Sequence, residues 1–240
     1  MDLSGATKVS DIAAASTAAT RILEKAGVDF CCGGQRSLQD ACMSAGVSTE
    51  EMIERLRAAS IQTEPGDGAW LSAPLNELTQ HIRSKHHQYV REAIQHLQTL
   101  LTKVIARHGE NHPELAQIES LVAAVSGDMI MHMQKEEQVL FPYIDALERA
   151  ASGAGSLEPP FFQTVRNPIQ SMMRDHDAAG DLLKEIRRAT SDYTPPADGC
   201  VSYQALYREL HEFEQDLHQH VHLENNILFP RAVKLESGLS

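Results

Sequence analysis

Two segments of this 240-residue chain repeat one pattern of residues that can ligate metal ions. The first reads HMQKEEQVLFPY from His132, and the second reads HVHLENNILFPR from His220, 88 residues later. Each segment places a histidine four residues before a glutamate, namely His132 before Glu136 and His220 before Glu224. On a helix this spacing puts imidazole and carboxylate on one face, about 40° apart around the axis. Both side chains of a pair can therefore bind the same metal ion.

A lone histidine precedes each pair at a nearly constant distance. His87 lies 45 residues before His132, and His176 lies 44 residues before His220. Apolar residues surround these positions at helical spacing, so an unpaired imidazole would be costly there and metal ligation would remove that cost. His86 competes with His87, because either register suits the apolar neighbours. One such histidine alone is more often a hydrogen-bonded core residue, but two matching sets favour a shared metal site.

Four imidazoles and two carboxylates in the middle of a helical bundle predict a site for two metal ions. The carboxylates of Glu136 and Glu224 can bridge the ions while each ion takes two imidazoles. Nitrogen and oxygen ligands without thiolate suit iron, among other first-row ions, and argue against an iron–sulfur cluster at these positions. Six protein ligands also leave room for a bridging oxygen species and for open positions, which permit small-molecule chemistry or exchange of the metal.

Neighbouring polar residues are expected to lie outside this set of ligands. Glu137 is predicted to be exposed or to lie behind the ligands. His218 and His222 are also four residues apart, but they are two residues out of phase with His220 and Glu224. The resulting rotation of about 200° predicts that they face solvent.

The motif Cys31-Cys32-Gly33-Gly34 is a second candidate for chemistry. It lies between a helix stop and a helix start, and a thiol close to a helix N-terminus has a lowered pKa, which makes it a better nucleophile or metal ligand. The glycines permit unusual backbone angles and close approach. The alternative is two small buried residues in a turn. Cys42 and Cys200 lie outside such a context and are expected to be inert.

The elements that position these residues are predicted to be helices. Ala, Leu, Gln, Glu and Arg dominate, and no alternating β-branched run indicates a strand. The predicted fold class is all-α, with a small helical domain at residues 1–61, a linker containing Pro and Gly at 62–73, and an antiparallel four-helix bundle at 74–240. The first domain is predicted to hold three helices, one near residues 17–25, one that starts after Ser37, and one from Ser48 to about residue 59.

The bundle is predicted to contain four longer helices, near residues 74–108, 113–149, 162–189 and 202–235. Its second helix can be interrupted at Gly127 or Pro142, and its third near Pro168. Pro74 and Gly109 are suited to the start and the end of the first of these helices.

Charge and hydropathy exclude several classes of protein. Asp and Glu total 33 against 21 Lys and Arg, which gives a net charge of −12 and argues against binding to nucleic acid or to anionic membranes. No apolar run approaches the ~20 residues that a spanning helix needs, and the N-terminus lacks the features of a signal peptide. Four cysteines are too few for a disulfide scaffold. A reduced, cytoplasmic protein is therefore expected.

Together these motifs resemble the hemerythrin-like domain and, more closely, the iron–sulfur cluster repair di-iron proteins of the RIC (repair of iron centres) family. The segments TAATRILEKAGVDFCCGG from Thr17 and RDHDAAG from Arg174 carry the resemblance with the two His-x-x-x-Glu segments, and it covers nearly the whole chain. The resemblance chooses His87 over His86. The iron ligands that it implies are His87, His132, Glu136, His176, His220 and Glu224.

The resemblance implies repair of iron–sulfur clusters damaged by oxidative or nitrosative stress in the bacterial cytoplasm. Its clients would be damaged or apo iron–sulfur proteins, and nitric oxide or O2 could bind at the two iron ions. Iron donation and reduction of nitric oxide to nitrous oxide both stay open, with Cys31 and Cys32 as a relay for metal or electrons. An O2 or NO sensor or carrier is the competing hypothesis, although ordinary hemerythrins usually have one more histidine. A homodimer also stays open.

Overall fold

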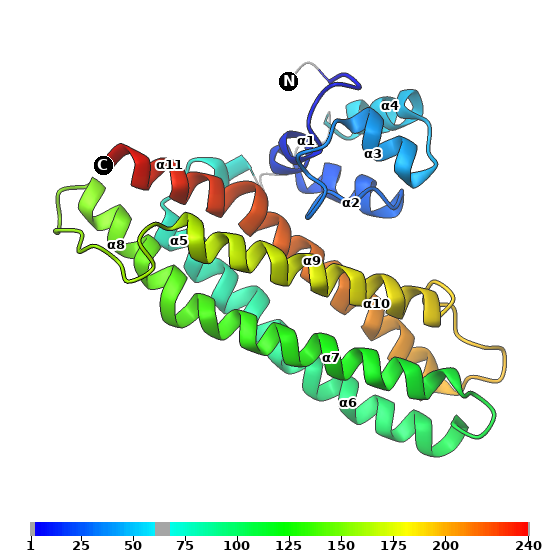
Figure 1. Cartoon of the computed structure of the whole chain (residues 1–240). Helices are drawn as coiled ribbons and strands as arrows, with labels where there is room; N and C mark the ends of the chain where they lie inside the picture. The colour runs from blue at the N-terminus through cyan, green and yellow to red at the C-terminus, as the bar shows by residue number, and fades with distance from the viewer. Residues whose placement is uncertain (1–2, 61–67, 240) are drawn as a thin grey trace. The chain divides into compact units, whose positions relative to one another are not determined.

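The structure is a computed structural model that describes residues 3–60 and 68–239. Every named element within these residues is a helix (Figure 1), so the predicted all-α fold class is confirmed. None of the described helices combines the length and the apolar character needed to cross a membrane. The chain divides into two compact units, the first comprising Met1–Gln80, Pro142–Ile169 and His218–Ser240, and the second His81–Phe141 and Gln170–Leu217.

Four helical stretches that run side by side build the second unit (Figure 1). Short loops reverse the chain after the first and the third stretch, so each of these pairs is antiparallel, as predicted. The stretches are the π turn η2 (Ile82–His87) with α6 (Gln88–His108), α7 (Glu114–Lys135) with the π turn η3 (Glu136–Leu140), α9 (Arg166–Ala189) from residue 170 onward, and α10 (Val201–His222) up to residue 217.

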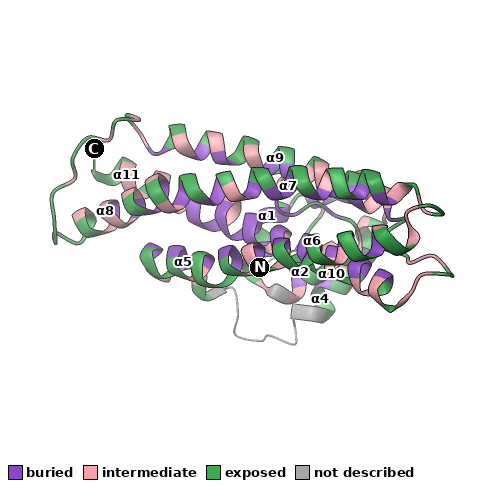
Figure 2. Ribbon diagram, turned by 90° about the horizontal axis from the view of Figure 1, so that it is seen from below, coloured by how far each residue is buried: buried purple, intermediate pink, exposed green. Residues whose placement is uncertain are grey.

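Each stretch buries one apolar face, visible as purple bands along the helices (Figure 2). The apolar residues recur at intervals of three and four, which is the helical period. Burial of each large apolar side chain stabilises the fold by about 1.5–3 kcal/mol. The core includes Val90, Ile94, Leu97 and Leu101 of α6, Ile118, Val122 and Val125 of α7, Leu183 and Ile186 of α9, and Leu210, Phe213 and Leu217 of α10.

The second long helix is not interrupted at Gly127, but its regular α-helical hydrogen bonding is interrupted just before Pro142, one of the two positions that the prediction allowed. It widens there into the π turn η3, where the backbone N–H of Phe141 donates to the carbonyl oxygen of Glu136, five residues earlier. In an α-helix the ring of Pro142 would clash with the carbonyl four residues before it, and the wider turn accommodates the proline. Such turns are frequent at functional sites.

The third long helix is not broken at Pro168. Helix α9 begins at Arg166, so Pro168 lies in its first turn. A proline is tolerated there, because the first N–H groups of a helix have no partner within the helix.

Within residues 3–60, the structure contains four helices rather than the three that the sequence predicts. The additional helix, α1 (Val9–Ala15), is short, and no side chain caps its N-terminus, so it lacks the usual signals. The remaining helices are α2 (Thr17–Lys25), α3 (Leu38–Ala45) and α4 (Thr49–Ser60) from the N-terminal part, followed by the 3-10 helix η1 (Gly68–Leu71), α5 (Leu75–His81), α8 (Phe141–Ala151), the π turn η4 (Leu223–Leu228) and α11 (Phe229–Leu239).

The predicted linker at 62–73 falls partly outside the described residues, which resume at Gly68. The N-terminal helices share an apolar core with one residue near the end of α10, Val221. Fully buried members of this core are Val9, Leu23, Leu38 and Cys42.

Candidate metal centre

Four of the predicted ligands converge in the second unit. His87 comes from η2, His132 from α7, Glu136 from η3 and His176 from α9. Glu136 Oε2 lies 3.4 Å from His87 Nε2 and 3.3 Å from His132 Nε2. The Nε2 atoms of His132 and His176 lie 3.1 Å apart. All four side chains are completely or almost completely buried.

These distances fit a shared metal ion better than a hydrogen-bonded core. Bonds of about 2.1 Å between metal and ligand separate neighbouring ligands by roughly 3.0–3.4 Å, for octahedral and tetrahedral geometry respectively. The contacts of Glu136 and of His132 with their neighbours lie in that range. A buried cluster of imidazoles around a carboxylate is also a set of nitrogen and oxygen donors suited to iron. Buried His and Glu side chains of the described residues form groups that could hold a metal cation.

A second carboxylate lies behind His87. Glu137 Oε1 is 2.7 Å from His87 Nδ1 and accepts a hydrogen bond of 2.9 Å from Arg91 Nη2. Burial alone would raise the pKa of Glu137, but the hydrogen bonds from Arg91 and His87 hold that pKa below its usual range. Glu137 is therefore a carboxylate that lies behind a candidate ligand, which is one of the two positions expected for it.

His132 has an equivalent neighbour in Asp175, which the sequence did not single out. Asp175 Oδ2 lies 3.5 Å from His132 Nδ1 and accepts a hydrogen bond of 2.9 Å from Lys135 Nζ. The His132 imidazole, and next the Lys135 ammonium, lower the pKa of Asp175 to about 2. The only sequence signal was its position beside His176, in the segment RDHDAAG.

The choice between His86 and His87 can be compared with the structure. His87 is the one whose Nε2 atom faces Glu136. His86 is also buried, but its Nδ1 atom lies 2.9 Å from Asp216 Oδ1. The carboxylate near His86 is therefore that of Asp216.

The first unit holds the other His-x-x-x-Glu pair. His220 Nε2 lies 2.9 Å from Glu224 Oε1, and both side chains are completely buried. The spacing of four residues thus brings imidazole and carboxylate together on one helical face, as predicted. Glu224 lies on the π turn η4, just as Glu136 lies on η3.

The prediction that His218 and His222 face solvent is wrong. The two histidines do lie on a different face of the helix from His220, but residues of the N-terminal helices and of the cysteine loop cover that face. His222 is completely buried, accepts a hydrogen bond of 2.8 Å from Asn226 Nδ2 and packs against the ring of Phe30. His218 Nδ1 lies 2.9 Å from the carboxylate of Glu24.

The two cysteines of the Cys-Cys-Gly-Gly motif lie beside Asp29. The Sγ atom of Cys31 is 3.4 Å from Asp29 Oδ1 and 3.9 Å from the Sγ atom of Cys32. The backbone N–H of Cys32 also donates to Asp29 Oδ1, at 2.9 Å. These three side chains offer two sulfurs and one oxygen close enough together to hold a metal ion. Asp29 was not predicted as part of this group.

The expected lowering of the Cys31 pKa is wrong. The hydrogen bond with Cys32, burial and the negative charge of Asp29 together raise the pKa of Cys31 well above its usual value. These effects oppose the thiolate and outweigh any helix terminus nearby, so Cys31 is a neutral thiol in the absence of a metal.

Two asparagines hold the cysteine loop. Asn225 Nδ2 donates to the carbonyl of Cys31 at 3.1 Å, and Asn226 Nδ2 donates to the carbonyl of Phe30 at 2.8 Å. A Cβ atom at Gly34 would lie 2.7 Å from Asn226 Oδ1, so this glycine is required for close approach, as predicted. The residue that precedes Asn225 is the candidate ligand Glu224.

Cys200 has a context that the sequence analysis did not find. It directly precedes α10, and His108 approaches it from the end of α6. A hydrogen bond with His108, and then the backbone N–H groups of Tyr203 and Ser202, lower the pKa of Cys200 to about 7. Cys200 was expected to be inert because no neighbour that lowers a thiol pKa was identified, and that reason is wrong. Cys42 is buried, which raises its pKa.

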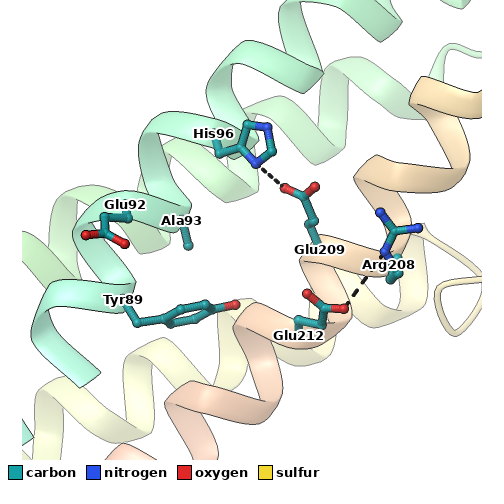
Figure 3. A pocket seen from close by; sticks show the side chains of 7 residues that line it. All are labelled: Tyr89, Glu92, Ala93, His96, Arg208, Glu209 and Glu212. Carbon is teal, nitrogen blue, oxygen red and sulfur yellow. Dashed lines mark ion pairs between the residues drawn. The ribbon is translucent and has the colours of Figure 1, made fainter. Parts of the chain in front are cut away.

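A surface hollow of about 420 Å³ lies between α6 and α10 in the second unit (Figure 3). Its lining includes an ion pair between His96 Nδ1 and Glu209 Oε2 at 2.8 Å. The ring of Tyr89 reaches from α6 toward α10. None of the predicted metal ligands lines this hollow, whose residues are Tyr89, Glu92, Ala93, His96, Arg208, Glu209 and Glu212.

Two known families together match most of the chain. Residues 78–232 match the hemerythrin HHE cation binding domain. Residues 5–60 match ScdA_N, which is described as a domain of unknown function. The first match contains every predicted metal ligand, and the second contains Cys31 and Cys32.

Curated bacterial proteins are similar over nearly their whole length. The probable iron–sulfur cluster repair protein of Haemophilus influenzae is 36% identical over 231 residues, covering 94% of this chain and 96% of the relative. The iron–sulfur cluster repair protein ScdA of Staphylococcus haemolyticus is 34% identical, with coverage of 87% and 89%. The iron–sulfur cluster repair protein YtfE of Musicola paradisiaca is 34% identical, with coverage of 95% and 96%.

Proposed function

Because this chain belongs to the family of hemerythrin-like iron–sulfur cluster repair proteins, we propose that it repairs damaged iron–sulfur clusters with two bound iron ions. The names of the relatives fit repair, and they do not fit the alternative of an O2 or NO carrier. The clients are damaged or apo iron–sulfur proteins in the bacterial cytoplasm, with nitric oxide or O2 as small-molecule ligands. The proposed iron ligands are His87, His132, Glu136, His176, His220 and Glu224.

The observation that carries this proposal is the buried carboxylate of Glu136 beside two imidazoles. Each of its two contacts, 3.3 Å with His132 and 3.4 Å with His87, matches the separation of two ligands bound to the same ion. The sequence repeat supports the second pair, since His220 and Glu224 make the same helical pair and are equally buried. Glu136 and Glu224 would supply the carboxylate ligands, and the four histidines would supply the imidazole ligands.

Bound iron would supply open coordination positions and an ion that can be delivered to a client. The protein's own residues hold and shield it. Imidazole and carboxylate are nitrogen and oxygen ligands that suit iron, and no thiolate is among the six proposed ligands. The buried setting keeps bulk water from the ligands, since His87, His220 and both glutamates are completely buried.

Cys31 and Cys32 are the proposed relay for metal or electrons. With Asp29 they form a small cluster of sulfur and oxygen donors. Cys31 is buried and Cys32 is partly exposed, so the pair connects the protein interior with the surface. All four cysteines of the chain are free thiols, as a reduced compartment requires.

Iron content and iron transfer test the proposal. The protein is loaded with Fe2+ without oxygen and desalted, and iron is measured per chain. We expect about two ions per chain in the unaltered protein and clearly fewer in His132→Leu and in His220→Leu. The matched control is His96→Leu, because His96 is an exposed histidine of α6 that pairs with Glu209.

The loaded protein is then mixed with an apo iron–sulfur protein. Recovery of the cluster, with loss of iron from this chain, would support donation of iron. Nitrous oxide is measured in the same sample after addition of nitric oxide and an electron donor. Nitrous oxide over many turnovers would instead assign an NO reductase. Full retention of iron by both histidine variants would contradict the proposed ligands.

A further inference from the structure

Two carboxylates stand behind two of the proposed ligands in the same arrangement. In each case the Nδ1 atom of a histidine faces the outer carboxylate, and its Nε2 atom faces Glu136. The first pair is His87 with Glu137, at 2.7 Å, and the second is His132 with Asp175, at 3.5 Å. The two outer carboxylates come from different helices, and the contact of Asp175 is the longer of the two.

A cation completes each arrangement. Arg91 Nη2 donates to Glu137 at 2.9 Å, and Lys135 Nζ donates to Asp175 at 2.9 Å. Arg91 and Lys135 therefore hold the carboxylates of Glu137 and Asp175 in place beside the two imidazoles. Arg91 and Lys135 are both partly exposed, so these cations are outer supports and not ligands.

A carboxylate beside Nδ1 favours one tautomer of the imidazole, the one with its proton on Nδ1. A carboxylate that accepts the Nδ1–H group leaves the lone pair on Nε2, which is the form that binds a metal. At His87 it also opposes rotation of the ring, because rotation would break the buried 2.7 Å hydrogen bond with Glu137. We propose that Glu137 and Asp175 are positioning residues that hold His87 and His132 with Nε2 toward bound iron. This inference rests on the function proposed above.

The fold itself does not require a carboxylate at the position of Glu137. The duplicated segment carries Asn225 where the first segment carries Glu137, at the same place after the glutamate ligand. Asn225 lies in the same kind of π turn, and its amide holds the cysteine loop instead. A π turn is therefore compatible with a neutral side chain here, and the charge of Glu137 serves its contact with His87.

The surface hollow of Figure 3 offers a matched control. His96 Nδ1 lies 2.8 Å from Glu209 Oε2, the same chemical pair as His87 with Glu137. His96 is nine residues beyond His87 on a continuous helical stretch, or about 13 Å along the axis. Its side chain is 63% exposed. Removing Glu209 therefore breaks a histidine–carboxylate pair that holds no proposed ligand.

The test is the affinity of the full chain for Fe2+ without oxygen, measured by competition with a chelator. Loss of a carboxylate behind a metal-bound histidine costs about 10–100-fold in metal affinity. We expect Glu137→Ala and Asp175→Ala each to lower the affinity at least about tenfold. Glu137→Gln keeps a hydrogen-bond acceptor without the charge, so we expect it to recover part of the loss. Glu209→Ala should bind iron like the unaltered chain.

The thermal midpoint of each variant without iron separates positioning from folding. We expect the midpoint of Glu137→Ala to stay close to that of Glu209→Ala. An affinity of Glu137→Ala and Asp175→Ala within twofold of the unaltered chain would overturn the inference. The inference would also be overturned if Glu137→Gln lost as much affinity for Fe2+ as Glu137→Ala and its thermal midpoint without iron were lowered. If His132→Leu also keeps its iron, the proposed iron site is wrong. If His132→Leu loses iron while Glu137→Ala and Asp175→Ala keep it, the site stands and only the positioning role is wrong.

Discussion

The backbone N–H of Phe229 donates a hydrogen bond to the carbonyl oxygen of Glu224, five residues earlier. Phe141 makes the same bond to Glu136 in the other copy of the repeat. Each proposed carboxylate ligand therefore sits at the start of a π turn rather than in a regular α-helix. The extra residue in such a turn changes the direction of the side chains around it, and π turns inside helices are frequent at functional sites.

The first prediction concerns the proline that follows each turn. In Pro230→Ala the ring no longer prevents α-helical hydrogen bonding, so the turn can tighten and rotate Glu224 away from its partner His220. We expect the affinity for Fe2+ to fall about tenfold, as for other changes that misorient a ligand, while the unfolding midpoint without iron stays level or rises. Chelator competition and thermal unfolding measure the two effects.

Pro168→Ala is the control for that substitution, because Pro168 lies in the first turn of α9, where its ring disturbs no helical bond. It should change neither iron affinity nor stability appreciably. An unaltered affinity in Pro230→Ala would show that the π turn does not depend on its proline.

Much of the architecture could be predicted from local patterns. Helical composition, apolar periodicity and the spacing of His132 and Glu136 are properties of neighbouring residues, and the structure places this pair as expected. The duplication added information from a distant part of the chain, because it identified a second His-x-x-x-Glu pair with the same spacing. The helical fold and the paired side chains therefore followed from the sequence.

Other features depend on contacts that no local pattern encodes. Helical phase places His222 away from His220, but only the packing of the cysteine loop decides that this face is covered. Similarly, the lowered pKa of Cys200 needs His108, which is 92 residues away in the sequence. The π turns were missed because their hydrophobic period is indistinguishable from that of an α-helix over five residues.

A second prediction separates iron binding from iron delivery. Replacing Cys31 and Cys32 with Ala removes two sulfur donors of the cluster with Asp29 but no proposed ligand of the two iron ions. We expect iron content to stay near that of the unaltered chain, and the rate of cluster recovery in an apo iron–sulfur protein to fall about tenfold or more. Cys200→Ala is the control, since it removes a thiol in the second unit and should leave recovery unchanged. Undiminished recovery in the double variant would assign the pair to structure.

A third prediction follows from the contact of Cys200 with His108. The lowered pKa of about 7 means that Cys200 is half thiolate near neutral pH, whereas an ordinary thiol with a pKa of about 8.5 is only about 3% thiolate there. We expect iodoacetamide to alkylate Cys200 with a rate that rises through about pH 7 and is roughly tenfold that of an ordinary thiol at pH 7. Mass spectrometry resolves the labelled sites.

Two comparisons within the chain check the cause of this reactivity. His108→Gln removes the imidazole, so the midpoint of the rate profile should move up toward about 8.5. Cys42 should label slowly in the folded chain, because it is completely buried and its pKa is raised. A Cys200 profile centred near pH 8.5 in the unaltered chain would contradict the role of His108.

The last prediction concerns an ion pair at the end of α9 in which the carboxylate is buried and the guanidinium is partly exposed. Arg187 binds both carboxylate oxygens of Glu214, whose side chain is only 2% exposed, and its guanidinium also lies over the ring of Tyr193. Arg187→Met leaves the Glu214 carboxylate buried without this cation, which should lower the free energy of unfolding by about 3 kcal/mol. Denaturant unfolding of the iron-free chain measures the loss.

The control for this ion pair lies three residues earlier on the same helix. Lys184 pairs with Asp181 at 2.9 Å, but both side chains are mostly exposed, so Lys184→Met should cost less than about 1 kcal/mol. A double variant, Arg187→Met with Glu214→Leu, removes both charges and should recover much of the stability that Arg187→Met loses, because an apolar pair can replace a buried ion pair. Equal losses in the Arg187 and Lys184 variants would mean that burial of Glu214 does not set the cost.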